Sequence, residues 1–210
     1  MGVRTGREYL EGIRDDRELW CDGERIKNVT TDPRFSGGAK TLAALYDLQW
    51  KPDLIEKMTY QSPVTGDRVG LSFIQPRTQE DLTRRREMFK IWNDYTCGMF
   101  GRSPDFMNVM LSSYAAAADA FNSDQSQFGK NVEAYYEFAR EHDIATTHAL
   151  VSPQVDRSKA PDAQVKDIAA RIVGENDKGF IINGVRMLAT LAAIADDIVV
   201  MPAPSYPLGD

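Results

Sequence analysis

Apolar residues recur at three- and four-residue spacing through most of residues 1–145, which is the period of amphipathic helices. The clearest case lies within residues 39–50, where Leu42, Leu45 and Tyr46 share one face and Pro52 follows the end. The same period predicts four further helices, over Gly6–Arg14, from Thr78 towards Cys97, from Pro104 through the alanine run Ala115–Ala118, and over about Gly129–Glu141. We expect the methionine and aromatic residues of these helices to pack in a hydrophobic core.

Local signals mark the starts of three of these helices. Thr5 is a plausible N-cap for the first, because its hydroxyl can accept a hydrogen bond from a free backbone N–H. Thr78 and Asp81 have the spacing of a capping box. Pro104 suits the first turn of a helix, where its missing N–H would have no helical partner.

Two hairpins are predicted between the helices. Residues 20–26 have Asp22-Gly23 at their centre, the dipeptide that favours a tight two-residue turn. A second hairpin is expected between Met58 and Phe73, around the turn residues Pro63–Gly66. Neither hairpin changes the helical character of this region.

The pattern changes after Thr146 to that of strands and turns. Ile168–Val173 and Phe180–Arg186 are predicted strands joined by a turn, and Ile198–Met201 is a predicted short buried strand. The prolines that follow leave such a sheet with an open edge, which natural proteins avoid, so we expect the chain to be the N-terminal part of a larger protein. The predicted class is α+β, with a helical domain over residues 1–145 and the first part of a β domain over residues 146–210.

Composition narrows the function classes. The formal net charge of −6 argues against a nucleic-acid surface, and the cluster Arg84–Arg86 follows acidic residues on a predicted helix, as a solvated face would. No apolar run is long enough for a membrane span, and the N-terminus lacks the apolar core of a signal peptide. The two cysteines, Cys21 and Cys97, indicate a reducing compartment without a disulfide scaffold, and we take this compartment as the cytoplasm. Two cysteines and two scattered histidines also make a structural zinc site improbable.

Two side chains stand out as candidates for chemistry. Arg102 precedes a predicted helix start, where a guanidinium beside free N–H groups can bind an anion; pairing with Asp105 on the surface is the alternative. His148 lies among small and apolar residues, a setting that suits a hydrogen-bonded core histidine at least as well as a functional one. The residue types alone leave both alternatives open.

Weaker signals are Thr190, a hydroxyl in an apolar run that could be an ordinary strand residue, and Asp156-Arg157, which could form a salt bridge in a turn. Neither a dinucleotide-binding glycine motif nor a P-loop occurs in the sequence. A nicotinamide cofactor is therefore not expected to bind in the usual way.

Several separated motifs, in the same order, resemble one family. These are Thr5-Gly6-Arg7-Glu8-Tyr9-Leu10, Gly101-Arg102-Ser103-Pro104-Asp105, Arg140-Glu141-His142-Asp143, the segment Thr147–Lys159, and Met187-Leu188-Ala189-Thr190. They resemble the oxygenase component of two-component, flavin-dependent 4-hydroxyphenylacetate 3-monooxygenases. The resemblance implies an acyl-CoA dehydrogenase-like fold, a helical domain followed by a barrel-like β domain, with a C-terminal helical bundle outside this chain and a tetramer in the complete protein.

The resemblance also implies an activity and a partner. A separate NAD(P)H-dependent flavin reductase would supply reduced FAD, which reacts with O2 to a C4a-hydroperoxyflavin. That species would hydroxylate a phenolic substrate ortho to its hydroxyl. Arg102, Phe106 and His148 would lie at the substrate, and Arg102, His148 and Thr190 would be the catalytic residues. The residues implied to contact the flavin are Thr146, His148, Pro153, Gln154, Arg157 and Thr190, and no metal is implied.

One departure and two alternatives remain. Family members usually have tyrosine at the position of Phe106, where its hydroxyl contacts the phenol oxygen, so a non-phenolic aromatic substrate becomes conceivable. The related 4-hydroxybutyryl-CoA dehydratases carry an iron–sulfur cluster on two cysteines four residues apart; Cys97 matches the first, but Gly101 occupies the second position. The other alternative is a non-catalytic fragment that needs a partner chain.

Overall fold

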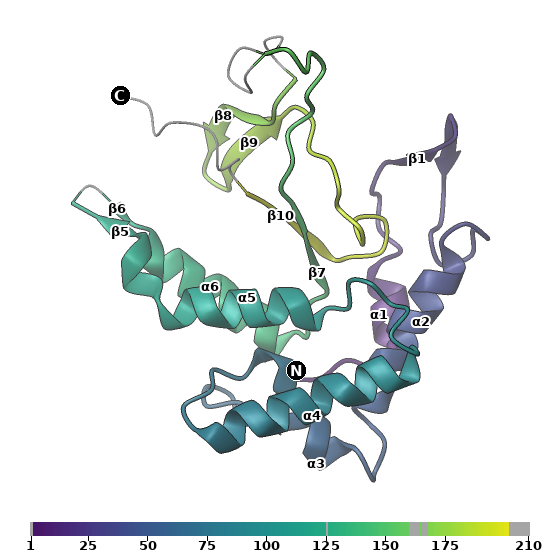
Figure 1. The fold of residues 1–210 in the computed structure, drawn as a ribbon, viewed down its shortest axis with the longest axis vertical. Coiled ribbons are helices and arrows are strands. Elements are labelled where there is room, and N and C mark those ends of the chain that lie inside the picture. The colour runs from purple at the N-terminus through teal and green to yellow at the C-terminus, as the bar shows by residue number, and fades with distance from the viewer. Residues whose placement is uncertain (1, 125, 160–163, 165–167, 202–210) are drawn as a thin grey trace. The chain divides into compact units, whose positions relative to one another are not determined.

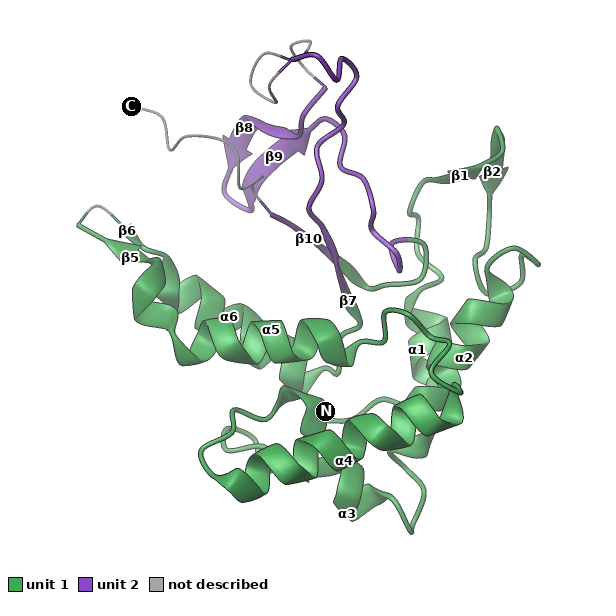
Figure 2. Cartoon of the chain, in the orientation of Figure 1, with its two compact units in different colours: residues 1–146, 193–197 green, residues 147–192, 198–210 purple. Residues whose placement is uncertain are grey.

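A computed structural model of the protein describes residues 2–124, 126–159, 164 and 168–201. The chain is a mixture of helices and short antiparallel or parallel strand pairs (Figure 1). It divides into two compact units (Figure 2): unit 1 comprises residues 1–146 and 193–197, and unit 2 comprises residues 147–192 and 198–210. The two units are defined by contacts within this chain. The predicted boundary between a helical and a β domain after residue 145 stays a prediction for the complete protein.

Helices α1 (Gly6–Gly12) and α2 (Ser36–Leu48) pack against each other in unit 1. The predicted cap is confirmed, because Thr5 accepts from the backbone of Glu8 and the Glu8 carboxylate accepts from Thr5 in return. The helices approach closely at Gly6, where a Cβ atom would lie 2.4 Å from the carbonyl oxygen of Ala43. Helix α2 begins three residues earlier than its apolar pattern indicated.

Both predicted hairpins are present. Strands β1 (Leu19–Cys21) and β2 (Glu24–Ile26) pair around Asp22-Gly23, which have φ angles of 52° and 78° as a mirror-image turn requires. Strands β3 (Thr59–Gln61) and β4 (Arg68–Gly70) form the second hairpin. This hairpin is shorter than expected, because helix α3 (Ile55–Met58) precedes it and the 3-10 helix η1 (Leu71–Phe73) follows it.

Helix α4 (Gln79–Tyr95) starts at the predicted capping box of Thr78 and Asp81. Its buried face carries Met88 and Trp92, and the indole nitrogen of Trp92 donates to the carbonyl oxygen of Leu45 across 3.2 Å. The helix ends at Tyr95, and the positive φ of Cys97, 52°, turns the chain soon afterwards.

Helices α5 (Asp105–Ala116) and α6 (Phe128–Glu141) lie side by side (Figure 1). Their core consists of Phe73, Leu111, Ala115, Tyr136 and Ala139. The 3-10 helix η2 (Ala118–Phe121) and the pair β5 (Asn122–Ser123) and β6 (Ser126–Gln127) connect them. A Cβ at Gly129 would lie 2.5 Å from the carbonyl oxygen of Ala118, so the alanine run and this glycine together permit the close contact.

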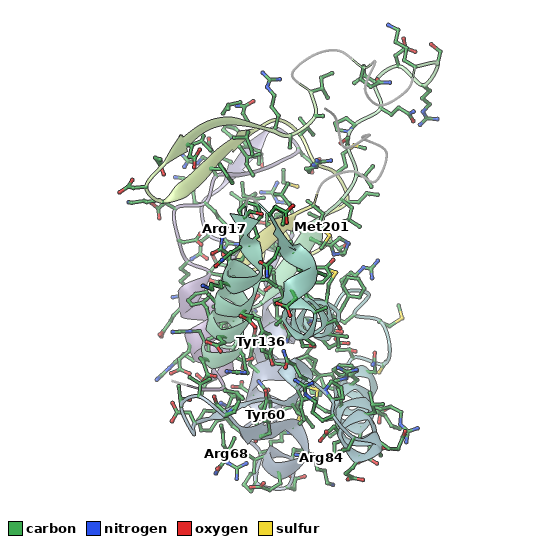
Figure 3. The ribbon with its side chains drawn as sticks, turned by 90° about the vertical axis from the view of Figure 1, so that its left-hand side faces the viewer. Arg17, Tyr60, Arg68, Arg84, Tyr136 and Met201 are labelled. Carbon is green, nitrogen blue, oxygen red and sulfur yellow. The ribbon has the colours of Figure 1, made fainter. Side chains whose placement is uncertain are left out.

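Tyr136 of α6 and Tyr60 of β3, both labelled in Figure 3, extend this core. The Tyr136 hydroxyl donates to the carbonyl oxygen of Phe73 across 2.6 Å, and the guanidinium of Arg140 lies 5.0 Å from the Tyr136 ring centroid. Burial raises the pKa of Tyr60 above its ordinary value, so its hydroxyl stays neutral. The methionine and aromatic residues expected in the core are therefore divided: Met107 and Tyr136 are buried, whereas Phe106 and Phe138 are 42% and 44% exposed.

Unit 2 contains an antiparallel pair, β8 (Arg171–Asn176) and β9 (Gly179–Asn183), and most of the pair β7 (Thr146–Ala149) and β10 (Asp197–Val200). The predicted strand at Ile168–Val173 was placed three residues too early, and the return strand ends before Val185. The strand predicted at Ile198–Met201 is confirmed as β10, one residue earlier, but the expectation that it is buried was wrong. Ile198 and Val200 are 47% and 40% exposed because they point to the same open side of β10.

Among the described residues, no helix is both long enough and apolar enough to cross a membrane.

Candidate functional site

The start of helix α5 holds the first two candidate residues. Pro104 precedes the helix with helical backbone angles, as its position in the sequence indicated. The guanidinium carbon of Arg102 lies 4.6 Å from the ring centroid of Phe106, one helical turn away. Both side chains are exposed, and no ion pair between Arg102 and Asp105 occurs among the described residues. The Arg102 guanidinium therefore contacts the Phe106 ring by a cation–π interaction, and the ion pair with Asp105 considered above is not formed.

Asp105 was not recognised as a candidate from the sequence. Its Oδ1 is buried without a hydrogen-bond partner in the described part of the chain. Burial raises the pKa of the Asp105 carboxyl, and a hydrogen bond with Ser103 opposes that rise. The sequence analysis considered Asp105 only as a surface partner of Arg102, and an acidic residue in a first helical turn is common enough that nothing signalled its burial.

His148 lies in strand β7, whose four residues are all buried. The side chain is only 7% exposed, so the histidine is a buried residue of unit 2, as its apolar surroundings indicated. Burial alone does not distinguish a structural histidine from a functional one, and its role stays a prediction.

A second segment of unit 2 lies beside the residues that follow β7. Val151 and Met187 form an antiparallel bridge, in which the amide of Met187 donates to the carbonyl oxygen of Val151 across 2.8 Å. Arg186 also donates to the hydroxyl of Ser152. Because the two segments run in opposite directions, the residues before Val151 and those after Met187 lie on the same side of the bridge. His148 precedes it by three residues and Thr190 follows it by three.

Thr190 begins a turn, so its interpretation as a strand residue was wrong. The cause is Leu188, whose φ of 63° is uncommon for a residue with a side chain and ends the extended segment. Thr190 and Leu188 are both exposed. The threonine hydroxyl is thereby held at a sharp change of chain direction.

The remaining residues predicted to contact a flavin are Thr146, the first residue of β7, and three residues of the segment that follows this strand. Gln154 and Arg157 are exposed, Pro153 is partly buried, and Thr146 is the last residue of the first stretch of unit 1 and is fully buried. The carboxylate of Asp156 pairs with Lys159, at 3.3 Å, and accepts hydrogen bonds from Ser158. The interpretation of Asp156-Arg157 as a salt bridge was therefore wrong.

The structure thus defines two groups, each by itself. Arg102 and Phe106 are brought together in unit 1, and in unit 2 the Val151–Met187 bridge joins the two segments that carry His148 and Thr190. In the described ranges, no group of three histidine, cysteine, aspartate or glutamate side chains could hold a metal ion, and Cys97 is an exposed free thiol.

A buried polar cluster in unit 1 has no counterpart in the sequence-based predictions. Arg4 donates from Nη1 and Nη2 to the two carboxylate oxygens of Asp196, at 3.1 and 2.6 Å, and from Nε to the carbonyl oxygen of Asp143 at 2.9 Å. The ring centroids of Tyr9 and Tyr46 lie 5.6 and 5.0 Å from its guanidinium carbon. Burial alone would lower the pKa of Arg4, but the charges of Tyr46, Asp196 and Asp143 raise it above its ordinary value. Arg4 directly precedes a recognised motif, but nothing near it in the sequence identifies Asp196.

A cavity of about 540 Å³ opens beside this cluster in unit 1. It is lined by the N-terminal segment from Gly2 to Thr5 together with Glu8, Trp50, His142 and Ile144. None of the residues implicated in catalysis by the family resemblance lies in it. The second histidine of the chain, His142, contributes to this wall, and its ring lies 4.7 Å from that of Phe138.

Comparison with known proteins gives a consistent result. The family model for the N-terminal region of 4-hydroxyphenylacetate 3-hydroxylases matches residues 5–209. The chain is 40% identical over 209 residues to a probable 4-hydroxyphenylacetate 3-monooxygenase of Bacillus subtilis. It is 43% identical over 203 residues to the oxygenase component of 4-hydroxyphenylacetate 3-monooxygenase of Thermus thermophilus. The matches include 98% and 96% of this chain and 43% and 41% of those relatives, so the chain spans about two fifths of their length.

Solved structures agree with this. The oxygenase component of a 4-hydroxyphenylacetate 3-monooxygenase, complexed with FAD and 4-hydroxyphenylacetate, matches 95% of this chain with a TM-score of 0.87 and 43% identity, over 41% of its own length. An archaeal 4-hydroxybutyryl-CoA dehydratase from N. maritimus matches with a TM-score of 0.80 at 22% identity, covering 95% of this chain and 40% of its own. The second likeness concerns the fold alone.

Proposed function

The chain belongs to the 4-hydroxyphenylacetate 3-hydroxylase family, and on that premise we propose that it is the N-terminal region of the oxygenase component of a two-component aromatic monooxygenase. The complete protein uses reduced FAD and O2 to hydroxylate an aromatic, phenolic substrate ortho to its hydroxyl. The observation that carries this proposal is the Val151–Met187 bridge in unit 2, which joins the segment after the buried His148 to the segment before the exposed Thr190. Similarity to an oxygenase component crystallised with FAD and 4-hydroxyphenylacetate supports it.

By the family resemblance, Arg102, Phe106 and His148 would each contact the substrate. A phenol reacts through its ortho carbon faster when its oxygen is ionised. A guanidinium beside that oxygen favours the ionised form, and a histidine can accept or relay the proton. Phe106 holds the guanidinium from one side at 4.6 Å and offers a ring but no hydroxyl. Arg102 and His148 therefore carry the polar recognition that a tyrosine at position 106 would share.

The residues present fit a flavin. Gln154, Arg157 and Thr190 are exposed and provide amide, guanidinium and hydroxyl donors for the polar edge of the ring and for an anionic pyrophosphate. Val185, Met187 and Leu188, at 49%, 40% and 74% exposure, add an apolar surface that a flat aromatic ring can cover. The flavin-contacting set is Thr146, His148, Pro153, Gln154, Arg157 and Thr190.

Thr190 has the most specific role in this proposal. Its hydroxyl, exposed at a turn, would donate a hydrogen bond near N5 of the flavin. When bound, reduced FAD supplies together with O2 the electrophilic oxygen that is transferred to the ring. The protein's own tasks are to orient the phenol, to hold its proton and to exclude water from the site.

The wider setting follows from the same premise. The fold is acyl-CoA dehydrogenase-like, with a helical domain over residues 1–145 and the first part of a barrel-like β domain over residues 146–210. The partner is a separate NAD(P)H-dependent flavin reductase, and the complete protein is a homotetramer. The free thiols of Cys21 and Cys97 suit the reducing cytoplasm in which we expect it to work.

The test uses the complete protein, 4-hydroxyphenylacetate, FAD and NADH, with and without a flavin reductase. We expect the ortho-hydroxylated product only when the reductase is present, and no NADH oxidation by this protein alone. NADH oxidation without the reductase would show that the protein reduces its own flavin. The dehydratase alternative predicts instead the dehydration of 4-hydroxybutyryl-CoA, and Gly101 at a cluster-ligand position argues against it.

A further inference from the structure

Strand β7 carries His148, and its own sequence does not fix how it pairs. All four of its residues, Thr146–Ala149, are buried, so there is no alternation of buried and exposed positions to select a register. Two of them, Thr146 and Thr147, are identical, so a shift by one residue would place one threonine at the position of the other at little cost in free energy. A slip by one residue would turn every side chain of the strand to the opposite face of the sheet. Some other contact must therefore hold β7 in register.

Backbone hydrogen bonds identify the register that β7 adopts. At its start, the carbonyl oxygen of Ala145 accepts from the amides of Asp196 and Asp197, at 2.8 and 3.3 Å. At its end, the carbonyl oxygen of Ala149 accepts from Met201 at 3.2 Å. From Ala145 to Ala149 and from Asp197 to Met201 both segments advance by four residues in the same direction, so β7 and β10 pair in parallel.

The start of this pairing is held by side-chain hydrogen bonds as well as by the backbone. Oδ2 of Asp196 accepts from the amide of Ala145 at 2.7 Å, so Asp196 contacts Ala145 through both its backbone and its side chain. The same oxygen accepts from Nη2 of Arg4 at 2.6 Å. The fork of two hydrogen bonds from Arg4 leaves the Asp196 carboxylate a single orientation.

Further donors of unit 1 hold the residues around Asp196. Tyr9 donates to the carbonyl oxygen of Ile194 at 2.6 Å, Arg17 donates to that of Ala195 at 2.7 Å, and Tyr135 donates to the Asp197 carboxylate at 3.0 Å. The short segment Ala193–Asp197 is thereby fixed on both sides of Asp196. A shift of Ala145 along β10 would break its hydrogen bonds with Asp196, because the contacts of Ala193–Asp197 with unit 1 hold Asp196 in place.

We propose that Arg4 and Asp196 are positioning residues that pin the register of β7, and through it the face of the sheet on which His148 lies. Only the functional consequence rests on the proposed function: a displaced His148 would no longer contact the phenol. The register itself is a property of the fold. Arg4 and Asp196 need not touch the substrate or the flavin.

The experiment uses the complete protein and compares Asp196→Ala with Asp32→Ala as a matched control. Asp32 accepts a similar fork from Arg34, at 3.0 and 2.9 Å, and its side chain is 16% exposed against 15% for Asp196. The readout is the rate at which diethyl pyrocarbonate modifies His148, followed in its own peptide by mass spectrometry, with His142 as the internal reference. Removal of a charge-assisted contact should raise the His148 rate about 10- to 100-fold in Asp196→Ala and leave it unchanged in Asp32→Ala.

Arg4→Lys is the milder variant if Asp196→Ala fails to fold. Lysine retains the positive charge but cannot make two parallel hydrogen bonds to the Asp196 carboxylate, so the modification rate of His148 should rise by a smaller factor. Amide exchange of Ala145 should accelerate in the same variants, while exchange in helix α5 stays unchanged. Equal His148 rates in Asp196→Ala and Asp32→Ala, or equal rates in Arg4→Lys and the unaltered protein, would overturn the inference.

A functional readout separates this inference from the proposed function. Asp196→Ala should weaken binding of 4-hydroxyphenylacetate and shift the pH profile of turnover, which loss of general stability would not do. If the unaltered protein binds neither reduced FAD nor a phenol, the proposed function fails. The modification rates of His148 still decide the question of register in that case, because they are measured without flavin.

Discussion

The side-chain nitrogen of Gln49 donates to Oδ2 of Asp143 across 2.8 Å, while Oε1 of Gln49 has no hydrogen-bond partner among the described residues. A Cβ atom at Gly70 would lie 3.0 Å from Oε1 of Gln49 and 3.4 Å from Oδ1 of Asp143, so both oxygens border one small space. A proton on Oδ1 of Asp143 could be donated to the amide oxygen. Protonation of the Asp143 carboxyl thus adds a donor near the unpaired amide oxygen of Gln49.

The electrostatics of the cluster agree with this. Burial raises the pKa of Asp143 to about 6, against an ordinary value of 3.8, and the charge of Arg4 and the hydrogen bond from Gln49 only partly oppose the rise. Arg4 is already paired with Asp196. The folded state therefore binds a proton at Asp143 more tightly than the unfolded chain does, and the resulting stability is present below pH 4 and lost as the pH rises through 6.

We therefore predict that Asp143→Asn increases the free energy of unfolding at pH 7.5, by up to about 3 kcal/mol. The new amide can donate to Oε1 of Gln49 and still accept from Gln49 and Arg4 at any pH. Urea unfolding at pH 5 and pH 7.5 measures the effect, with the exposed Asp53→Asn as the control. If the unaltered protein and Asp143→Asn lose stability equally between these pH values, Asp143 is ionised in the folded state throughout.

A second prediction concerns Arg102 and Phe106. Arg102→Ala should lower turnover of 4-hydroxyphenylacetate by about 10- to 100-fold, because a charge-assisted contact to the phenolate is lost. Phe106→Tyr should keep or improve that turnover by restoring a hydroxyl at the phenol oxygen. Product formation is measured for both variants with 4-hydroxyphenylacetate and with indole, which has no phenol.

The two substrates distinguish two kinds of site. If the natural substrate lacks a phenol, Phe106→Tyr should impair its turnover, since a buried hydroxyl would be left without a partner. Phe106→Leu serves as the control that removes the ring over which the guanidinium lies. Full activity of Arg102→Ala on every accepted substrate would refute the assignment of the substrate site.

A third prediction concerns Thr190. Thr190→Ala removes one neutral hydrogen bond near the flavin, worth about 0.5–1.5 kcal/mol, and should raise the ratio of released hydrogen peroxide to hydroxylated product. Thr190→Ser should behave as the unaltered protein, and Thr83→Ala, a hydroxyl deletion on helix α4, should have no effect. Unchanged coupling in Thr190→Ala would reduce Thr190 to a turn residue.

A fourth prediction addresses the strained residue beside it. Leu188 has a φ of 63° and is 74% exposed, so glycine at this position relieves backbone strain and gives up little packing. Because glycine also makes the unfolded chain more flexible, we expect Leu188→Gly to change stability by less than about 1 kcal/mol in either direction. The comparison variant is Leu82→Gly, at an exposed position of helix α4, which should lower the free energy of unfolding by about 1 kcal/mol. A greater loss in Leu188→Gly than in Leu82→Gly would contradict the strain argument.

The sequence by itself determined those parts of the protein in which neighbouring residues interact. Thr5 with Glu8, and Thr78 with Asp81, cap their helices through hydrogen bonds that span three residues. The turn at Asp22-Gly23 needs only the backbone freedom of those two residues. Such contacts form wherever the local sequence allows them, so pattern and composition are sufficient to predict them. The motifs around Arg102, His148 and Thr190 were likewise sufficient to recognise the family.

Tertiary structure alone decided how distant residues meet. Arg4 and Asp196 are 192 positions apart, and no rule of local sequence predicts their hydrogen bonds. Nor does such a rule connect Asp196 with Ala145 at the start of β7. The exposure of Ile198 and the positive φ of Leu188 were also unpredictable, because each depends on what packs beside a short segment. Propensity describes what a segment can form by itself, whereas register, burial and strain depend on the free energy of contacts that exist only once the chain has folded.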